Sequence, residues 1–527
     1  MVDDKIVKNV QTTFSLYGLM ITSKLSTSIA KEMEKMEDER ESWLIKIVEQ
    51  ILSQNLENPR IELDHIKKAI IECMRPENSL KHTETILNVI NALDIPKVTY
   101  DMERRKFVLE KIGINMYPDA TYKSLIFRDR FNILWHRTLK HPMFLAPKLG
   151  ETSIGRCKLT PIEYLLSESR TINVYVMGLL SQLVEGQYYL EDISGVVKID
   201  LKNAKFQDGL IVDGSIVLAN GNYDDNILYV KDIGFPPAEA SNISRAPFGD
   251  HNTFGGPHPV SLKTSEKLQK HEQNNPDGMI VFVSELWVDS LEVLDKFKIM
   301  LVGYAEFPPI AFVLCGQFLS FPPNTTSTQK MKEGFKRLAN IVELFENIKK
   351  ESKFIIVPAP YDLGAPKILP RAPLPKCLVE DFIKTVPGTI LATNPCRIQY
   401  CTKEIVVLRE DMVSRLCRNT LFFPTEGEVY EHYAKSIICQ AHLTPMNLPV
   451  IPIYWKHDHA LQLYPVPDLI VVADQFESYT TEHMECKVMN PGSFPKNNFS
   501  FMAYVPAMNN IDICAIPVDT DLMNLDT

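Results

Sequence analysis

The chain has 527 residues, of which 45% are hydrophobic, and a formal net charge of −10. A chain of this length exceeds one ordinary core, so we expect two to four domains in a globular protein. The acidic balance argues against a protein whose main task is to coat nucleic acid, because phosphate binding requires clustered Lys and Arg. The N-terminal residues lack the apolar region of a signal peptide, and no stretch approaches the roughly 18 apolar residues of a membrane span, which predicts an intracellular protein.

The ten cysteines are spread from Cys73 to Cys514 without a CxxC pair. In a long intracellular chain this scatter predicts reduced thiols, most of them packed in cores. Cys396 and Cys401 lie close together, but no second pair at zinc-finger spacing lies nearby, so we expect no zinc site there.

Residues 1–95 show apolar positions that recur three and four residues apart, with short polar turns between the runs. Nothing in this segment resembles a nucleotide-binding loop or a metal cluster. The pattern predicts a small helical domain whose function is to dock a partner. The positions that define it are Leu44, Ile47, Val48, Ile51, Ile86, Val89, Ile90 and Leu93.

Residues 96–161 break this pattern and mix short strand-like runs with prolines. We interpret the segment as a linker with partial structure, including some ordered helix. Its basic residues fit a solvated helix face better than a DNA-binding patch, because a chain this charged must expose such residues somewhere. These residues are Arg128, Arg130, Arg137 and Lys140.

Residues 162–240 change to a period of two, with short apolar alternations bounded by Gly, Asp or Asn. Such short strands in close succession predict a small OB-type β-barrel. Exposed aromatics on such barrels can stack on single-stranded nucleic acid, and the candidates here are Tyr175, Tyr188, Tyr189 and Tyr223. The local acids favour packing and subunit contact instead. Residues 241–277, rich in Pro, Gly, Ser and Asn, predict a connector loop.

Residues 278–527 alternate apolar runs with helical stretches. Apolar runs that each end at a loop are typical of an α/β sheet whose sites lie at the strand ends. The runs are residues 279–283, 311–314, 354–357 and 469–472.

The residues that follow these runs resemble, in position, the metal-ligand series of dinuclear metallophosphoesterases of the calcineurin type. In chemistry they differ, because two divalent cations need converging carboxylates and imidazoles, which side chains such as Trp287, Pro360 and Phe476 cannot supply. We therefore expect a calcineurin-like α/β sandwich lacking its metal ligands, with no catalytic residue and no cofactor. The degenerate positions are Glu285, Trp287, Gln317, Pro360, Tyr361, His442, Asp474 and Phe476.

Three of these positions keep groups that could hold a single ion, namely Glu285, His442 and Asp474. We expect each of them instead to be hydrogen-bonded and partly buried, as most such polar groups are in folded proteins. His457 and His459 are likewise expected to be a pair of surface histidines and not a ligand set.

Four short motifs carry a closer resemblance, and they are TNPCRI at 393–398, HLTP at 442–445, YPVPD at 464–468 and NPGSF at 490–494. Together with the order of helical domain, OB barrel and degenerate phosphoesterase domain, they resemble the B subunits of the eukaryotic replicative DNA polymerases alpha, delta and epsilon. The small helical domain directly precedes the rest of the chain, and this arrangement is similar to that of the epsilon members. The domain itself is similar to the small helical domain of AAA+ ATPases.

This resemblance implies a noncatalytic nuclear subunit that acts as a scaffold in DNA replication. Its OB and phosphoesterase-like domains would clamp the C-terminal, cysteine-rich region of the epsilon catalytic subunit, and the helical domain would link the polymerase to the replicative helicase through GINS. Small histone-fold subunits would join the holoenzyme, with at most weak contact to DNA and none to membranes. Two alternatives stay open: a divergent metal-dependent phosphodiesterase or exonuclease, and a single-stranded DNA-binding module.

Overall fold

The computed structural model describes residues 4–33, single positions between 44 and 69, and residues 85–110, 116–145, 156–168 and 170–516. The chain forms two compact units, Met1–Glu84 and Thr85–Thr527. Among the described residues, no helix combines the length and the apolar character needed to cross a bilayer.

Two packed helices begin the first unit, α1 (Asp4–Leu16) and α2 (Ser23–Met33). Their apolar faces bury Val10, Phe14 and Ile29 completely, as expected of amphipathic helices. Most other residues up to Glu84 lie outside the described residues, so the helical domain as a whole stays a prediction. The described positions that join the same buried cluster are Leu44, Ile47, Val48 and Ile51.

The end of the predicted helical domain is instead a strand of the second unit. β1 (Leu87–Asn91) pairs antiparallel with β14 (Cys396–Tyr400), with Val89 opposite Ile398. The short helix η1 (Ala92–Asp94) follows it. The prediction of a helix over these residues is wrong, because pairing with a strand far along the chain outweighs a local apolar pattern.

The segment predicted as a linker is ordered over most of its described length. β2 (Lys97–Asp101) and β3 (Lys106–Glu110) form a hairpin, and the helix α5 (Tyr122–Lys140) follows. This helix contacts β2, the barrel strand β4 and the short helix η5 (Trp455–Leu461). It is thus a packed part of the second unit, which corrects the interpretation as a linker.

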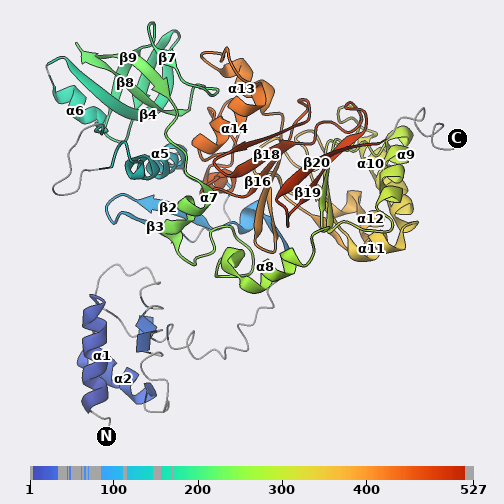
Figure 1. Cartoon of the computed structure of the whole chain (residues 1–527), viewed down its shortest axis with the longest axis horizontal. Coiled ribbons are helices and arrows are strands. Elements are labelled where there is room, and N and C mark those ends of the chain that lie inside the picture. The colour runs from blue at the N-terminus through green and yellow to red at the C-terminus, as the bar shows by residue number, and fades with distance from the viewer. Residues whose placement is uncertain are drawn as a thin grey trace. The chain divides into compact units, whose positions relative to one another are not determined.

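A closed barrel forms where the sequence predicts it, and it lies at one end of the second unit (Figure 1). The strand order is β6-β5-β4-β8-β9-β7, and a further pairing of β6 with β9 closes the barrel. Alternate residues such as Val174, Val176 and Val217 fill its core. The strands are β4 (Ile172–Val184), β5 (Gln187–Glu191), β6 (Val196–Asp200), β7 (Lys205–Phe206), β8 (Ile216–Asp224) and β9 (Ile227–Gly234), preceded by α6 (Ile162–Ser167).

The predicted connector contains short helical turns rather than a continuous loop. They are α7 (Ser241–Arg245), η2 (Ala246–Phe248), η3 (Leu262–Thr264) and α8 (Glu266–Gln273).

The first sheet of the remaining part has the order β13-β12-β11-β10-β19-β20, with β10 to β13 parallel and β19 and β20 antiparallel. Its strands are β10 (Ile280–Ser284), β11 (Ala311–Cys315), β12 (Lys353–Val357), β13 (Thr389–Leu391), β19 (Ser500–Val505) and β20 (Asn510–Ala515). Its helices are α9 (Leu291–Gly303), α10 (Ser327–Glu343), α11 (Glu346–Glu351), η4 (Lys376–Leu378) and α12 (Glu380–Thr385).

The second sheet has the order β1-β14-β15-β16-β18-β17. Its other strands are β15 (Lys403–Arg409), β16 (Leu469–Ala473), β17 (Tyr479–His483) and β18 (Cys486–Asn490). The helices α13 (Val413–Asn419) and α14 (Val429–Cys439) belong to this half and lie on the side of the barrel (Figure 1).

The two sheets pack face to face, with helices on both outer faces. Ile280 and Phe282 of β10 point into a core shared with Val407 of β15 and Val471 of β16. The alternate residue Val281 joins the core beneath α9, α10 and α12. Strands covered on both faces need an unbroken apolar sequence, which is why these runs are visible in the sequence.

Candidate functional site

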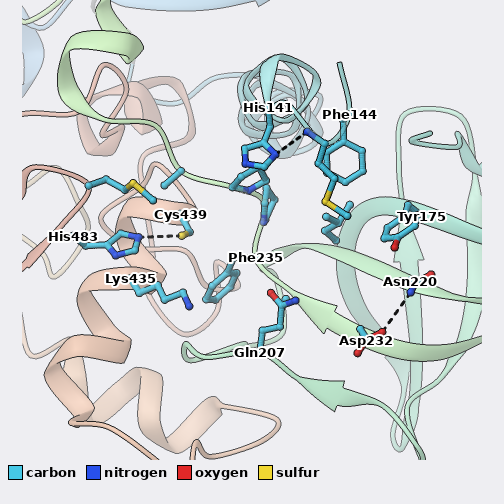
Figure 2. A pocket seen from close by; sticks show the side chains of 17 residues that line it. His141, Phe144, Tyr175, Gln207, Asn220, Asp232, Phe235, Lys435, Cys439 and His483 are labelled. Atoms are coloured by element: carbon cyan, nitrogen blue, oxygen red, sulfur yellow. Dashed lines mark hydrogen bonds between the residues drawn. The ribbon is translucent and has the colours of Figure 1, made fainter. Parts of the chain in front are cut away.

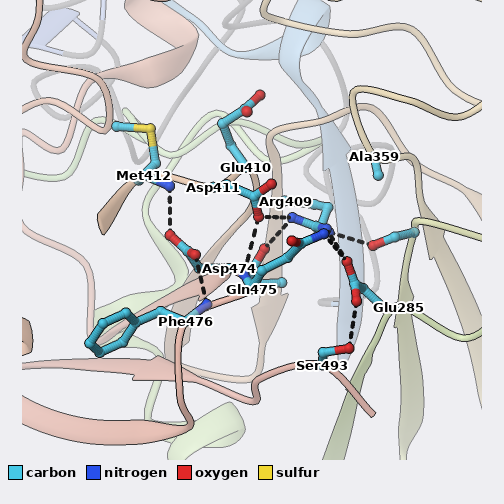
Figure 3. Close-up of polar contacts among 12 residues, drawn as sticks. Glu285, Ala359, Arg409, Glu410, Asp411, Met412, Asp474, Gln475, Phe476 and Ser493 are labelled. Carbon is cyan, nitrogen blue, oxygen red and sulfur yellow. Dashed lines mark hydrogen bonds and ion pairs between the residues drawn. The ribbon is translucent and has the colours of Figure 1, made fainter. Parts of the chain in front are cut away.

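Polar side chains from both sheets converge at one edge of the sandwich, where the central strands end (Figure 3). Glu285 follows β10, Arg409 ends β15 and Asp474 follows β16. The parallel pairs β10–β11 and β15–β16 bring neighbouring strand ends together within each sheet. This edge holds most of the degenerate phosphoesterase positions that the sequence predicts.

A buried guanidinium occupies the centre of this edge. The side chain of Arg409 is 1% exposed and forms ion pairs with Glu285 at 3.1 Å and Asp411 at 2.9 Å. It also donates to the carbonyl oxygens of Gly316 and Ala473. Burial alone would lower the pKa of Arg409, but Asp411 and Glu285 raise the pKa above its ordinary value. Arg409 is therefore a fixed cation held inside the protein.

The carboxylate of Glu285 is fully engaged. Besides Arg409, it accepts hydrogen bonds from Ser493 Oγ and Gln475 Nε2, and Lys496 Nζ lies 3.1 Å away. An ionised carboxylate offers about four acceptor positions. The four donors around Glu285 match this number of positions.

Asp474 supports a helix start. Its Oδ2 accepts from the backbone N–H groups of Met412 at 2.6 Å and Val413 at 2.8 Å, and its Oδ1 accepts from Phe476 N at 2.9 Å. Met412 and Val413 begin α13, whose first N–H groups have no partner within the helix. Burial raises the pKa of Asp474, although these hydrogen bonds oppose the shift. The predicted hydrogen-bonded role is observed, with the side chain more deeply buried than expected.

The aromatic positions among the predicted set make packing contacts. Lys496 Nζ lies 5.7 Å from the centre of the half-buried Trp287 ring. Phe476 lies edge-on against Tyr479, with ring centres 6.3 Å apart. Tyr361 is 40% exposed, and Lys367 Nζ lies 3.6 Å from its ring centre.

Two further positions of the predicted set lie nearby. The carbonyl oxygen of Pro360 accepts from Arg371 Nη1 at 2.8 Å. Gln317 follows β11 and is half-buried.

His442 belongs to a different buried network. Its Nε2 lies 3.3 Å from Asp458 Oδ1, and Asp458 accepts two hydrogen bonds from Arg130 of α5. Burial and the charge of Arg130 lower the pKa of His442. Burial would raise the pKa of Asp458, but Arg130 and His442 hold it well below its usual range. The structure thus places His442 with a helix of the supposed linker and not with Glu285 and Asp474.

The expectation that His457 and His459 form a surface pair is wrong. Both side chains are 3% exposed. They lie on η5, which contacts α5, β2 and η1, all from residues before 141. His459 Nε2 lies 3.1 Å from the carbonyl oxygen of Ile95. The sequence assigns these elements to a separate helical domain and a linker, so it predicts nothing that covers η5.

Arg137 of α5 joins the barrel to the sandwich. It is 1% exposed and donates to the carbonyl oxygens of Ile438 and Cys439 on α14 and of Pro236 after the barrel. Because Arg130 is also buried, at 6% exposed, the interpretation of these arginines as a solvated helix face is wrong for both. A guanidinium carries five donors, which lets one side chain satisfy several carbonyl groups.

The proposed stacking tyrosines do not form a common platform. Tyr223 is 2% exposed, and the side chains of Tyr175, Tyr188 and Tyr189 are half-buried. Among the described residues, no group of three or more His, Cys, Asp and Glu side chains is arranged to hold a metal ion. The residue that sequence reasoning missed is Arg409, and its signal is a charged residue that ends the apolar run of β15.

Stability is expected to fall as the pH is lowered from 7 toward 4. Burial, followed by the charge of His457, lowers the pKa of His459 from 6.5 to about 4. The unfolded chain therefore binds a proton near pH 6.5, whereas the folded chain does not until about pH 4, so the stabilisation is complete above pH 6.5 and lost below it. For His459 this amounts to at most about 3 kcal/mol.

Thermal unfolding of the full chain at a series of pH values measures this effect. The His459→Gln variant should show a smaller loss of melting temperature between pH 7 and pH 5 than the unchanged protein. His271→Gln, at an exposed position of α8, should show the same loss as the unchanged protein. Equal pH dependence in all three proteins would contradict the assignment.

Three family descriptions match successive parts of the chain. Residues 2–73 match the N-terminal domain of the DNA polymerase epsilon family, and residues 120–237 match the OB-fold domain of proteins like DNA polymerase epsilon subunit 2. Residues 280–481 match the family of B subunits of DNA polymerases alpha and epsilon. The OB-fold match includes α5, in agreement with the packing of this helix against β4.

Three full-length relatives share the name DNA polymerase epsilon subunit 2. The protein of Homo sapiens is 39% identical and covers 97% of this chain and 99% of its own length. The protein of Bos taurus is 39% identical over 96% of this chain and 98% of its own, and that of Drosophila melanogaster is 39% identical over 97% and 98%. Among solved structures, an archaeal phosphodiesterase matches 45% of this chain and 98% of its own at 12% identity, but its TM-score of 0.26 establishes no common fold.

Proposed function

Because the chain belongs to the family of DNA polymerase epsilon B subunits, we propose that it is the scaffold on which that polymerase is assembled for chromosomal replication in the nucleus. Members of this family are noncatalytic, and the chain is an accessory subunit of the polymerase. In the proposal, the barrel and the sandwich together hold the C-terminal cysteine-rich region of the catalytic subunit. The N-terminal helical domain links the polymerase to the replicative helicase through GINS, and small histone-fold subunits complete the holoenzyme.

The observation that carries the scaffold role is the buried polar contact between barrel and sandwich. Gln440 of the sandwich accepts from Ile216 N at 2.9 Å and donates to Ile216 O at 2.7 Å. Ser436 Oγ accepts from Leu210 N at 2.8 Å. With Arg137, these bonds fix two surfaces in one orientation, and a preorganised surface binds a partner at a lower entropic cost.

We further propose that the sandwich is a degenerate metallophosphoesterase in which Arg409 replaces the metal cations. A dinuclear site requires an excess of negative ligands around its ions. Here the carboxylates of Glu285 and Asp411 already neutralise one internal guanidinium. A divalent cation in the same place would meet a fixed positive charge at a distance where repulsion is strong.

Metal-dependent hydrolysis is therefore expected to be absent. The full chain, mixed with Mn²⁺ and bis-p-nitrophenyl phosphate, should release nitrophenol no faster than buffer with Mn²⁺ alone. The His442→Ala variant should behave identically. Hydrolysis that depends on Mn²⁺ and disappears in His442→Ala would support the alternative of a divergent phosphodiesterase and contradict this proposal.

Co-purification tests the assembly role directly. Tagged full chain recovered from nuclear extract should carry a large polymerase polypeptide and the GINS proteins, identified by mass spectrometry. A variant that lacks residues 1–84, the first compact unit, should keep the polymerase polypeptide and lose GINS. Recovery of the full chain without any polymerase polypeptide would refute the proposal, and retention of GINS by the shortened chain would refute the role of the first unit.

A further inference from the structure

A cavity of about 450 Å³ lies where the barrel, the turn after α5 and the sandwich meet. In Figure 2, Asp232 and Asn220 come from the barrel, Lys435 and His483 come from the sandwich on the opposite side, and Phe235 lies between them. A cavity of this size and mixed lining is typical of a small-molecule site.

The two ends of the cavity differ in chemistry. At the sandwich end, Lys435 supplies an ammonium group, and His483 lies nearby. Burial, followed by the charges of Lys435 and Arg137, lowers the pKa of His483, so that Lys435 is the cation at this end. At the barrel end, Asp232 supplies a carboxylate and Asn220 an amide. The cavity therefore offers an anion site at one end and acceptors for N–H donors at the other.

The polar groups of the lining make long contacts with one another and with neighbours outside the cavity, such as the hydrogen bond that Asn220 Oδ1 accepts from Asn173 Nδ2 at 3.4 Å. Lys435 Nζ lies 3.6 Å from the exposed Asp208, and Asn220 Nδ2 lies 3.4 Å from Asp232 Oδ2. The sulfur of Cys439 and His483 Nε2 are 3.8 Å apart. Strong hydrogen bonds to N–H donors measure 2.7–3.2 Å, as in the networks around Arg409 and Arg130. These groups are therefore available to an added ligand.

The lining between the two ends includes aromatic rings. The rings of Phe144, Tyr175 and Phe235 line it, and Tyr175 is the one stacking candidate from the sequence that lies on this cavity. Asp232 and Phe235 are three residues apart at the end of β9, which corresponds to about 10 Å in extended chain. At Gly234, between them, an added Cβ would lie 2.4 Å from Gln207 Oε1, so a larger residue would have to displace this lining side chain.

We propose that this cavity binds a nucleoside phosphate, with the phosphate at Lys435 and His483, the base against the aromatic rings, and the N–H groups of the base at Asp232. The polar ends and the aromatic lining agree with such a ligand, since every base has a face for stacking and guanine presents two adjacent N–H donors to a carboxylate. The ligand is either a free nucleotide or the terminal nucleotide of a single strand. This proposal does not depend on the assembly role proposed above.

Calorimetric titration of the full chain tests the site with dGMP, dTMP, inorganic phosphate and a single-stranded oligonucleotide ending in guanosine 5′-phosphate. We expect saturable binding of dGMP, weaker binding of dTMP and weaker still of phosphate. Lys435→Met should weaken dGMP binding at least tenfold, and Asp232→Asn should remove the preference for dGMP over dTMP. Lys231→Met, which removes the same charge from an exposed neighbour on β9, should change neither.

The outcomes separate the alternatives. If the oligonucleotide binds at a lower concentration than dGMP and displaces it, the cavity is a site for a strand end. If dGMP binds at the lower concentration, the cavity is a site for free nucleotide. Absence of saturable dGMP binding in the millimolar range, or equal losses in Lys435→Met and Lys231→Met, would overturn the proposal. A third outcome would also overturn it: no nucleotide binding is detected, and Lys435→Met loses the polymerase polypeptide in co-purification. The cavity would then be a protein-docking site. Unchanged melting temperatures establish that the variants are folded.

Discussion

Replacing Arg409 by methionine is expected to lower the free energy of unfolding by about 3–5 kcal/mol, the cost of removing one partner from a buried ion pair. The substitution leaves Glu285, whose side chain is 1% exposed, without its strongest cation. It also leaves the carbonyl oxygens of Gly316 and Ala473 without their donor. Urea unfolding followed by tryptophan fluorescence measures the change, since Trp287 packs beside Lys496 at the same edge.

Two further variants make this expectation sharp. Arg418→Met removes an arginine from an exposed position of α13 and should leave the unfolding curve unchanged. Adding Glu285→Gln to Arg409→Met removes the uncompensated carboxylate and should restore part of the stability. If Arg409→Met unfolds at the same urea concentration as the unchanged protein, the guanidinium is not the internal cation that we infer.

Replacing Arg130 by methionine is expected to have an effect of similar size, about 3–5 kcal/mol. Arg130 and Asp458 are 6% and 5% exposed, and two hydrogen bonds join them. Without the guanidinium, the carboxylate must stay charged in a buried place or take up a proton. The pKa of Asp458 is held below its usual range in the folded protein, so this stabilisation is present above about pH 4 and lost as the pH falls further.

A double-mutant cycle with Asp458→Asn isolates the pair. We expect the two single changes to be strongly non-additive, with a coupling of more than about 1 kcal/mol. Arg128→Met is the matched control, because Arg128 is exposed on the same helix two residues earlier. Additive effects of Arg130→Met and Asp458→Asn would show that the two side chains do not act as a pair.

The strands of the barrel and the sandwich could be predicted from the sequence because the spacing of apolar residues along each strand reflects which of its faces are buried. Ile280 to Val283 form an unbroken apolar run, since both faces of β10 are covered. β1 could not be predicted in the same way. Its five residues take their structure from β14, and their own spacing fits a helix equally well.

The location of the candidate site at the strand ends could be predicted from the sequence, but the side chain at its centre could not. Trp287 and Phe476 carry no ligand atoms, but the charge that ends the apolar run of β15 does not by itself show that Arg409 pairs with Glu285 after β10. The prediction that Arg130 and Arg137 are exposed is wrong for a related reason. Charged residues on a helix are usually solvated, and their burial depends on carbonyl and carboxylate partners from the distant residues around 438 and 458.

The position of β1 determines where a force on the first unit would act on the second unit. It is the first element of the second unit and directly follows the end of the first unit at Glu84. Tension applied through the first unit would therefore arrive at a five-residue strand at the edge of the second sheet, whose partners run from Cys396 to Tyr400. Such a load would be shared between the backbone pairing with β14 and the buried side chain of Ile90. β1 thus forms the edge of the second sheet at the point where the second unit begins.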